Sequence, residues 1–292
     1  MIDLFNAYQP LFDLVLLHSG YAFSQYIVLR AGVFSLATAG FAAVGAYTAA
    51  VLAVRFGIDP LPALAAALLS GMLVALLLSW PLSRLRGVYQ AIATLAFVQI
   101  VLSLNLYAEG VTGGAMGLNG IPKLVDSWGL LAVVAVVLYL MAAIGATRVG
   151  RAFDAVRQDE AVAATLGVSV VRHQALAFAL SGAIGGLFGG LEAFHSFALE
   201  PRQFGFGLMV TIVAYVVLGG RRAVSGPLAG TAILVALPEL ARPLADNRLL
   251  AFGVMLMLVI AFLPRGVADT LQERLKHRRI TRLDARLAGD TP

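Results

Sequence analysis

Few ionisable side chains fall inside the long apolar stretches of this sequence, and these few are the first candidates for chemistry. Glu192 and His195 stand one helical turn apart near the end of one stretch, and Glu239 stands near the end of another. Because an ionisable group is costly to bury in hydrocarbon, each of them predicts a functional cavity or a position at the edge of the apolar layer. Both interpretations remain open for all three residues.

Uncharged polar side chains also recur within apolar stretches. Such groups, together with local breaks from Ser35 to Gly45 and at 225–227, indicate polar contacts or exposed backbone along a solute pathway. The candidates for this pathway are Ser35, Thr38, Gln90, Thr94, Gln99, Glu192 and His195.

The catalytic patterns that would define an enzyme are missing from the sequence. A phosphate-binding loop needs a Gly-Lys pair, but Lys123 follows Pro122 and Lys276 follows Leu275. The chain has no cysteine, no histidine or carboxylate spacing typical of a metal site, and no Ser-His-Asp set. We therefore expect a protein that is not an enzyme and binds no metal or cofactor itself. Any ATP hydrolysis would belong to a separate subunit.

The composition places these candidates in a membrane. The chain is 60% hydrophobic and 13% charged, with a mean hydropathy of +0.88, whereas soluble domains are about 25% charged. Several apolar stretches approach the ~20 residues that cross a bilayer as a helix. We predict an all-α polytopic bundle of eight to ten spans. The nine spans favoured are 11–29, 31–54, 60–80, 88–107, 129–147, 173–195, 205–219, 227–241 and 249–263.

The basic residues separate strongly between the two sides of this arrangement. One side receives Arg30, Arg84, Arg86, Arg148, Arg151, Arg157, Arg172, Arg221, Arg222 and the seven basic residues from Arg265 to Arg286. The other side receives Arg55, Lys123, Arg202, Arg242 and Arg248. The positive-inside rule makes the first side cytoplasmic and accounts for the basic pI of 9.8 without nucleic acid. We expect a membrane domain over 1–265, with a cytoplasmic loop at 148–172, and a basic cytoplasmic tail over 266–292.

The stretch GRAFDAVRQDEAVAATLGV at 150–168 is unusually polar for this chain. Arg151, Asp154, Arg157 and Glu160 alternate in sign every three residues, which supports a solvated helix. Gly167 predicts the end of that helix. A surface linker between two spans is one interpretation. The other is a helix offered to a cytoplasmic partner, with apolar contacts from Phe153, Val156, Ala163 and Leu166.

Glycines punctuate the apolar stretch that follows. Gly182, Gly186 and Gly190 recur every four residues, and Gly185 and Gly189 form a second pair. Small residues at this spacing allow another membrane helix to approach closely, so we expect these positions to pack helix against helix.

Several stretches, taken in order, carry a family resemblance. They are Ser35-Leu36 with GAYTAA (45–50), RLRGVYQAIATLAF (84–97), TGG with Gly117 (112–117), Ile121-Pro122, the 150–168 stretch, Leu180-Ser181-Gly182, VLGGRRAVSGPLAG (217–230) and LPELAR (237–242). Together they resemble the permeases of branched-chain amino-acid ABC importers, specifically the M-type member of the pair. The resemblance covers about residues 30 to 265.

The resemblance implies an inner-membrane transport subunit that works by alternating access. Its partners would be a homologous second permease, two cytoplasmic ATPase subunits that bind ATP-Mg, and a periplasmic substrate-binding protein. The ATPase would dock on the loop near Glu160 to Gly167. The residues assigned to this coupling are Arg151, Phe153, Asp154, Arg157, Glu160, Ala163, Ala164 and Gly167.

Two departures from the family pattern keep other solutes open. Glu192, Phe194 and His195 stand where relatives have a Tyr-Ala-His order, and Arg221-Arg222 replaces a glycine and a small residue. Urea or a short amide is therefore an alternative solute to an amino acid. A secondary transporter driven by an ion gradient is the alternative of another class, and an intramembrane enzyme lacks a clustered nucleophile and base.

Overall fold

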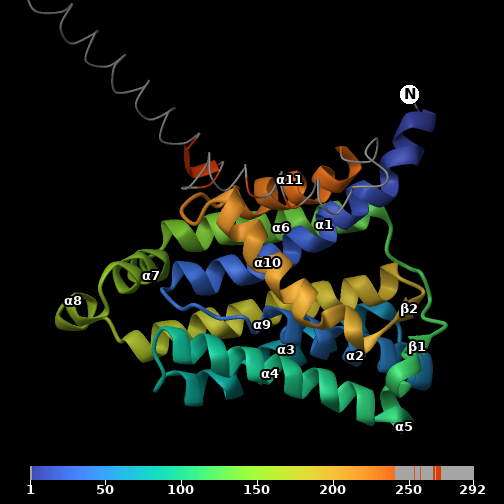
Figure 1. Ribbon diagram of the computed structural model, residues 1–292, viewed down its shortest axis with the longest axis horizontal. Coiled ribbons are helices and arrows are strands. Elements are labelled where there is room, and N and C mark those ends of the chain that lie inside the picture. Colours follow the sequence, from blue (N-terminus) through green and yellow to red (C-terminus); the bar gives the residue numbers. More distant parts are fainter. Residues whose placement is uncertain (1, 241–252, 254–256, 258–265, 267, 271–292) are drawn as a thin grey trace, which may run out of the picture.

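The computed structural model describes residues 2–240, 253, 257, 266 and 268–270, and it shows a bundle of long helices. The helices lie roughly side by side, with α7 and α8 at one end of the bundle and β1 and β2 at the other (Figure 1). The long helices are α1 (Ile2–Arg30), α2 (Thr38–Phe56), α3 (Pro60–Leu82), α4 (Val88–Tyr107), α6 (Ser127–Ala146), α9 (Val170–His195), α10 (Phe206–Gly219) and α11 (Gly226–Leu240). The short elements are α5 (Glu109–Thr112), η1 (Gly114–Met116), β1 (Leu118–Asn119), α7 (Arg148–Gln158), α8 (Glu160–Thr165), β2 (Ala198–Leu199) and η2 (Pro201–Phe204).

The predicted all-α polytopic fold is confirmed. In the described part of the chain, six helical segments are long and apolar enough to cross a membrane. They are Thr38–Phe56, Pro60–Leu82, Val88–Tyr107, Ser127–Ala146, Val170–His195 and Pro201–Gly219. The apolar helix Gly226–Glu239 is shorter. The predicted ninth span, 249–263, lies outside the described residues except for positions 253 and 257, and so does most of the predicted tail.

The predicted second span, 31–54, is wrong at its start, because α2 begins only at Thr38. Gly32 has φ +82°, and a Cβ placed on it would lie 3.0 Å from Cα of Arg157. Residues 33–36 have no regular secondary structure, and Val33 and Ser35 are buried while Phe34 is 43% exposed. Apolar composition marked this segment as part of a span, but the Ser35 carbonyl and the Leu36 amide bond the side chains of Gln25 and Thr94 instead of a helix ladder.

Helix α9 occupies the centre of the bundle and contacts α1, α2 and α3. Its two glycine rows explain this position. A Cβ added to Gly182 or Gly186 would lie 2.3 or 2.4 Å from a backbone carbonyl oxygen of α3. One added to Gly189 would lie 2.0 Å from the carbonyl oxygen of Ala42 in α2. Gly190 faces Leu64 and Ala67 of α3. The backbones therefore touch, as membrane helices do where small residues line the contact.

Loops at the β1–β2 end form a cap over the bundle. Strands β1 and β2 pair antiparallel, with Leu118 opposite Leu199. Further along, the amide of Ile121 donates to the carbonyl of Phe197 at 3.2 Å. Gly117 has φ +70°, and a Cβ there would lie 2.1 Å from the carbonyl oxygen of Leu199. The cap thus ties the α4–α6 connection to the α9–α10 connection.

Candidate functional site

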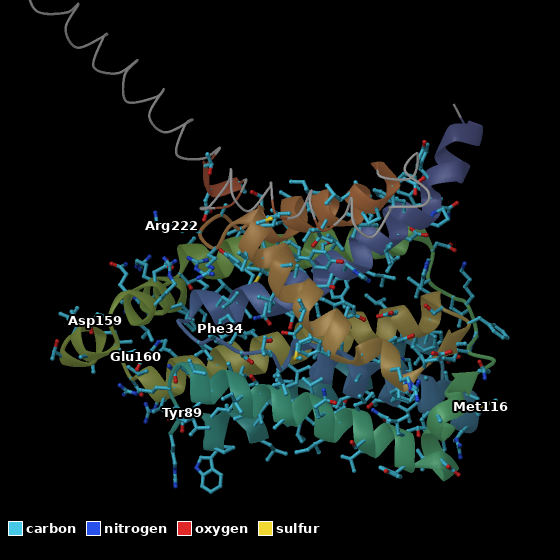
Figure 2. The ribbon with its side chains drawn as sticks, in the orientation of Figure 1. Phe34, Tyr89, Met116, Asp159, Glu160 and Arg222 are labelled. Atoms are coloured by element: carbon cyan, nitrogen blue, oxygen red, sulfur yellow. The ribbon has the colours of Figure 1, made fainter. Side chains whose placement is uncertain are left out.

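The polar stretch at 150–168 lies within two short helices that project from one end of the bundle, where Asp159 and Glu160 are labelled (Figure 2). The single helix predicted here is wrong, because α7 ends at Gln158 and α8 begins at Glu160. Asp159 is extended between them, and its Oδ1 accepts the amides of Ala161 and Val162 at 2.8 and 3.0 Å. The predicted helix end at Gly167 is confirmed, since α8 ends at Thr165 and Gly167, two residues later, has φ +83°.

An ion pair fixes α7 to the end of α1. The guanidinium of Arg30, whose side chain is 10% exposed, donates to both carboxylate oxygens of Asp154 at 2.9 and 3.3 Å. Arg157 approaches the same carboxylate at 3.7 Å. A bidentate pair of this kind sets direction as well as distance. The pair therefore fixes the position of α7 relative to the end of α1.

Apolar side chains of α7 and α8 also anchor this unit, which corrects the contacts expected from sequence. Phe153, Val156 and Ala163 are 0%, 2% and 1% exposed, so they pack against their own chain and do not face a partner. The Phe153 ring meets the His173 ring edge-on at 6.2 Å. In a helix with a strong apolar face, the buried side belongs to the core. Sequence periodicity identified that face but could not say what covers it.

The exposed side of the unit carries a different apolar set. Val162 and Leu166 are 55% and 75% exposed, and Val171 at the start of α9 is 55% exposed. Of the assigned coupling residues, Arg151, Ala164 and Gly167 are also exposed. We call Val162, Ala164, Leu166 and Val171 the apolar α8 patch. Val162 and Leu166 stand one helical turn apart, and exposed apolar side chains that gather on one face are typical of an interaction surface.

Glu160 joins α8 to two other parts of the bundle. Its carboxylate lies 3.5 Å from the guanidinium of Arg86 in the α3–α4 loop and accepts the Gln174 amide of α9 at 3.2 Å. The Arg86 side chain is 82% exposed, so this pair contributes little to stability. The bond to Gln174 orients α8 on α9.

We expect Asp159→Ala to unfold α8 locally while the bundle stays folded. The change removes the acceptor of two amides at the first turn, a loss that costs about 1 kcal/mol for an N-cap. Hydrogen exchange should rise at 161–166 and stay unchanged in α9. Asp159→Ser keeps an acceptor and should restore protection. Equal protection in Asp159→Ala and wild type would contradict this role.

Four of the predicted pathway residues form one buried network instead of an open cavity. Thr38 donates to the side-chain oxygen of Gln25 at 2.8 Å, and Gln25 donates to the carbonyl of Ser35 at 2.7 Å. The Thr94 hydroxyl accepts the amide of Leu36 at 2.9 Å. Gln90 is 5% exposed and lies 3.4 Å from the carbonyl of Leu82. This network supports the non-helical backbone before α2.

We expect Thr94→Val to destabilise the start of α2. The substitution keeps the shape of the side chain but leaves the Leu36 amide without its acceptor, which costs about 1–3 kcal/mol for a buried group. Thermal unfolding of the purified protein in detergent measures the loss. Thr94→Ser, which retains the hydroxyl, should lose much less. A Thr94→Val protein as stable as wild type would show that the bond is dispensable.

Glu192 and His195 lie in a second place, between α9 and α1. The Tyr21 hydroxyl donates to Glu192, and Nε2 of His195 lies 3.8 Å from Oδ2 of Asp13. Asp13 is 4% exposed, and among the described residues its Oδ1 has no hydrogen-bond partner. His18 of α1 also bonds the Tyr215 hydroxyl at 2.6 Å. These groups tie helices together inside the bundle.

Gln99 lies in a third place, on an outward face of α4. The predicted pathway residues are therefore not gathered in one site. Sequence reasoning also missed their partners in α1, namely Asp13, Tyr21 and Gln25. The signal was present, because Asp13 and Gln25 interrupt an apolar stretch, as the residues that were selected do.

One protein family matches most of the chain, over residues 20–263, and its description reads "branched-chain amino acid transport system / permease component". The chain belongs to this family. The permease is 31% identical to the high-affinity branched-chain amino acid transport system permease protein LivM of Salmonella typhimurium, over 86% of this chain and 67% of the relative. The same figures hold for LivM of Escherichia coli. It is 30% identical to a probable branched-chain amino acid transport permease protein LivH of Methanocaldococcus jannaschii, over 68% of this chain and 69% of the relative. No solved structure is significantly similar to it.

Proposed function

We propose that this permease is the membrane subunit of an ABC importer and carries a branched-chain or other amino acid inward by alternating access. The α7–α8 unit is the observation that supports this proposal most strongly. It combines a rigid anchor, the Arg30–Asp154 pair, with the outward-facing apolar α8 patch. The α7–α8 unit is fixed to α1 on one side and exposes apolar side chains on the other. It is therefore suited to bind a partner and to transmit the movement of that partner to α1.

The distribution of charge supports a cytoplasmic position for α7 and α8. Within the described residues, the α7–α8 end carries Arg30, Arg84, Arg86, Arg148, Arg151, Arg157, Arg172, Arg221 and Arg222. The β1–β2 end carries Arg55, Lys123 and Arg202. Short basic loops mark the cytoplasmic side of a membrane protein. In the inner membrane, the β1–β2 cap then faces the periplasm, and the basic tail over 266–292 is assigned to the cytoplasm.

The partners follow from the same proposal. Two cytoplasmic ATPase subunits bind ATP-Mg, and one of them contacts the α8 patch. A homologous second permease completes the membrane part, and a periplasmic binding protein delivers the solute to the β1–β2 cap. This chain itself binds no cofactor and hydrolyses no ATP. The relatives named LivM and LivH are both permease proteins for branched-chain amino acids, which supports a pair of homologous permeases.

One observation favours an alternative of another class. The Asp13–His195 contact and the Tyr21–Glu192 bond place ionisable groups between helices, where transporters driven by an ion gradient keep proton or ion sites. Urea or a short amide remains an alternative solute within the ABC proposal.

Uptake by proteoliposomes tests these alternatives. Vesicles that hold this chain, a second permease and the ATPase should accumulate labelled L-leucine only when the binding protein is present and ATP is supplied on the side of the ATPase. Vesicles that hold this chain alone should accumulate none, with or without a proton or sodium gradient. Gradient-driven uptake by the single chain would contradict the ABC proposal. Uptake of labelled urea but not of leucine by the full assembly would assign urea, and not an amino acid, as the solute.

A further inference from the structure

Gln99 and Ser103 differ from the other polar side chains of the long helices. The other serines and threonines that the structure describes in these helices all make a hydrogen bond. The same holds for the side-chain amides of Gln9, Gln25, Gln90, Asn105 and Gln174. Gln99 and Ser103 have no such partner among the described residues, although a helical serine can bond the carbonyl four residues earlier.

The two residues share one face of α4, a single helical turn apart, and both are exposed. Gln99 stands near the middle of the 20-residue helix, so its amide lies at the depth of the bilayer core. A hollow of ≈ 300 Å³ runs along this face and is lined by Gln99, Ile100, Ser103, Leu104 and Tyr107. Tyr107, 87% exposed, marks its end toward the β1–β2 cap.

Helix α3, which precedes α4 in the chain, provides a comparison because its exposed surface is suited to lipid. Its exposed large side chains are Leu61, Leu69, Leu73, Leu76, Leu77 and Trp80, and none of them is charged or carries an amide or hydroxyl. Hydrocarbon offers no hydrogen-bond partner, so holding an amide against it is unfavourable. The α4 face also exposes Ile100 and Leu104, but Gln99 and Ser103 add hydrogen-bonding groups at bilayer depth that suit water or a polar solute better than lipid.

We propose that this face of α4 is one wall of a water-filled solute path, in which the Gln99 amide and the Ser103 hydroxyl bind a small polar solute. The inference rests on the proposed function, because the opposite wall is assigned to the second permease. Both side chains donate and accept hydrogen bonds and neither is charged. They match the ammonium and carboxylate groups of an amino acid while holding them weakly, as passage through a membrane requires.

The chain has no cysteine, so single cysteines report directly on this face. The variants are Gln99→Cys and Ser103→Cys on α4, with Leu73→Cys on the exposed face of α3 and Val98→Cys as a buried control. The assembled transporter in membrane vesicles is treated with a small, charged, membrane-impermeant methanethiosulfonate reagent. Only a hydrated thiol forms the reactive thiolate, so Gln99→Cys and Ser103→Cys should react at least about tenfold faster than Leu73→Cys.

Reaction of the α4 cysteines no faster than Leu73→Cys would overturn the inference, because the face would then be dry, covered either by lipid or by a closely packed helix. Thermal unfolding of each variant shows that it is folded. The labelling requires neither ATP nor a known solute. A dry α4 face in a complex that still takes up leucine with ATP would therefore refute the inference alone and leave the proposed function standing.

Discussion

Gly186→Leu should prevent the bundle from packing. A Cβ at this position would lie 2.4 Å from the carbonyl oxygen of Ala67 and 3.1 Å from Cα of Gly71, both backbone atoms of α3 that no rotamer change can move. On its other side, Gly45 of α2 lies so close that its own Cβ would be 2.1 Å from the Gly186 carbonyl oxygen. Overpacking costs 1–3 kcal/mol where side chains can adjust. Here we expect about 3 kcal/mol or more, with loss of monodisperse protein on size exclusion in detergent.

Gly129→Leu is the matched control for this prediction. Gly129 is a helical glycine of α6 with no atom within 4 Å of an added Cβ. The Gly129→Leu substitution places the same side chain in a membrane helix, and it should leave yield and thermal stability unchanged. If Gly186→Leu also eluted and unfolded like wild type, α9 would not be packed backbone to backbone against α3.

Asp154→Asn should uncouple ATP hydrolysis from solute uptake. The substitution keeps the shape but removes the charge that binds the largely buried Arg30 guanidinium. Loss of one partner of a buried pair costs 3–5 kcal/mol, but the Asp154 side chain is 36% exposed, so we expect about 1–2 kcal/mol. Because α7 then moves without α1, leucine transported per ATP hydrolysed should fall severalfold while hydrolysis continues.

Arg86→Gln provides the comparison, because it removes a pair of similar type at 3.5 Å whose guanidinium is exposed. Exposed pairs contribute about 0–1 kcal/mol, so the ratio of leucine to ATP should stay near that of wild type. An unchanged ratio in Asp154→Asn, measured in the same proteoliposomes, would contradict the assignment of Arg30–Asp154 as the mechanical link.

Composition and spacing were sufficient to predict the membrane class and most of the helices. Hydrocarbon thickness sets the length of an apolar helix, so α3, α4 and α9 could be placed to within a few residues. The start of α2 could not, because the non-helical segment before it is as apolar as a helix. Its break involves a bond from Gln25 to Ser35 and a bond to Thr94, which lies 58 residues beyond Leu36 in the sequence.

The candidate site divides in the same way. The alternation of charge identified the α7–α8 unit. The spacing of apolar residues alone, however, does not distinguish a helix face packed on its own chain from a face that binds a partner. Phe153 and Ala163 are buried, and Val162 and Leu166 are the exposed pair. Likewise, polarity selected Gln90, Thr94 and Gln99 together, although only the third faces outward. Tertiary packing fixes the rotation of α4 about its own axis, and this rotation decides which of the three side chains face outward.

Retention of the ATPase by purified transporter tests the central claim most directly. Leu166→Asp places a charge in the apolar α8 patch, whereas Met116→Asp places the same charge at the opposite end of the bundle, at a side chain that is 83% exposed (Figure 2). We expect the ATPase to co-purify with wild type and Met116→Asp and to be lost from Leu166→Asp, with all three chains equally stable to heat. Full retention of the ATPase by Leu166→Asp, or its loss from Met116→Asp alone, would contradict it.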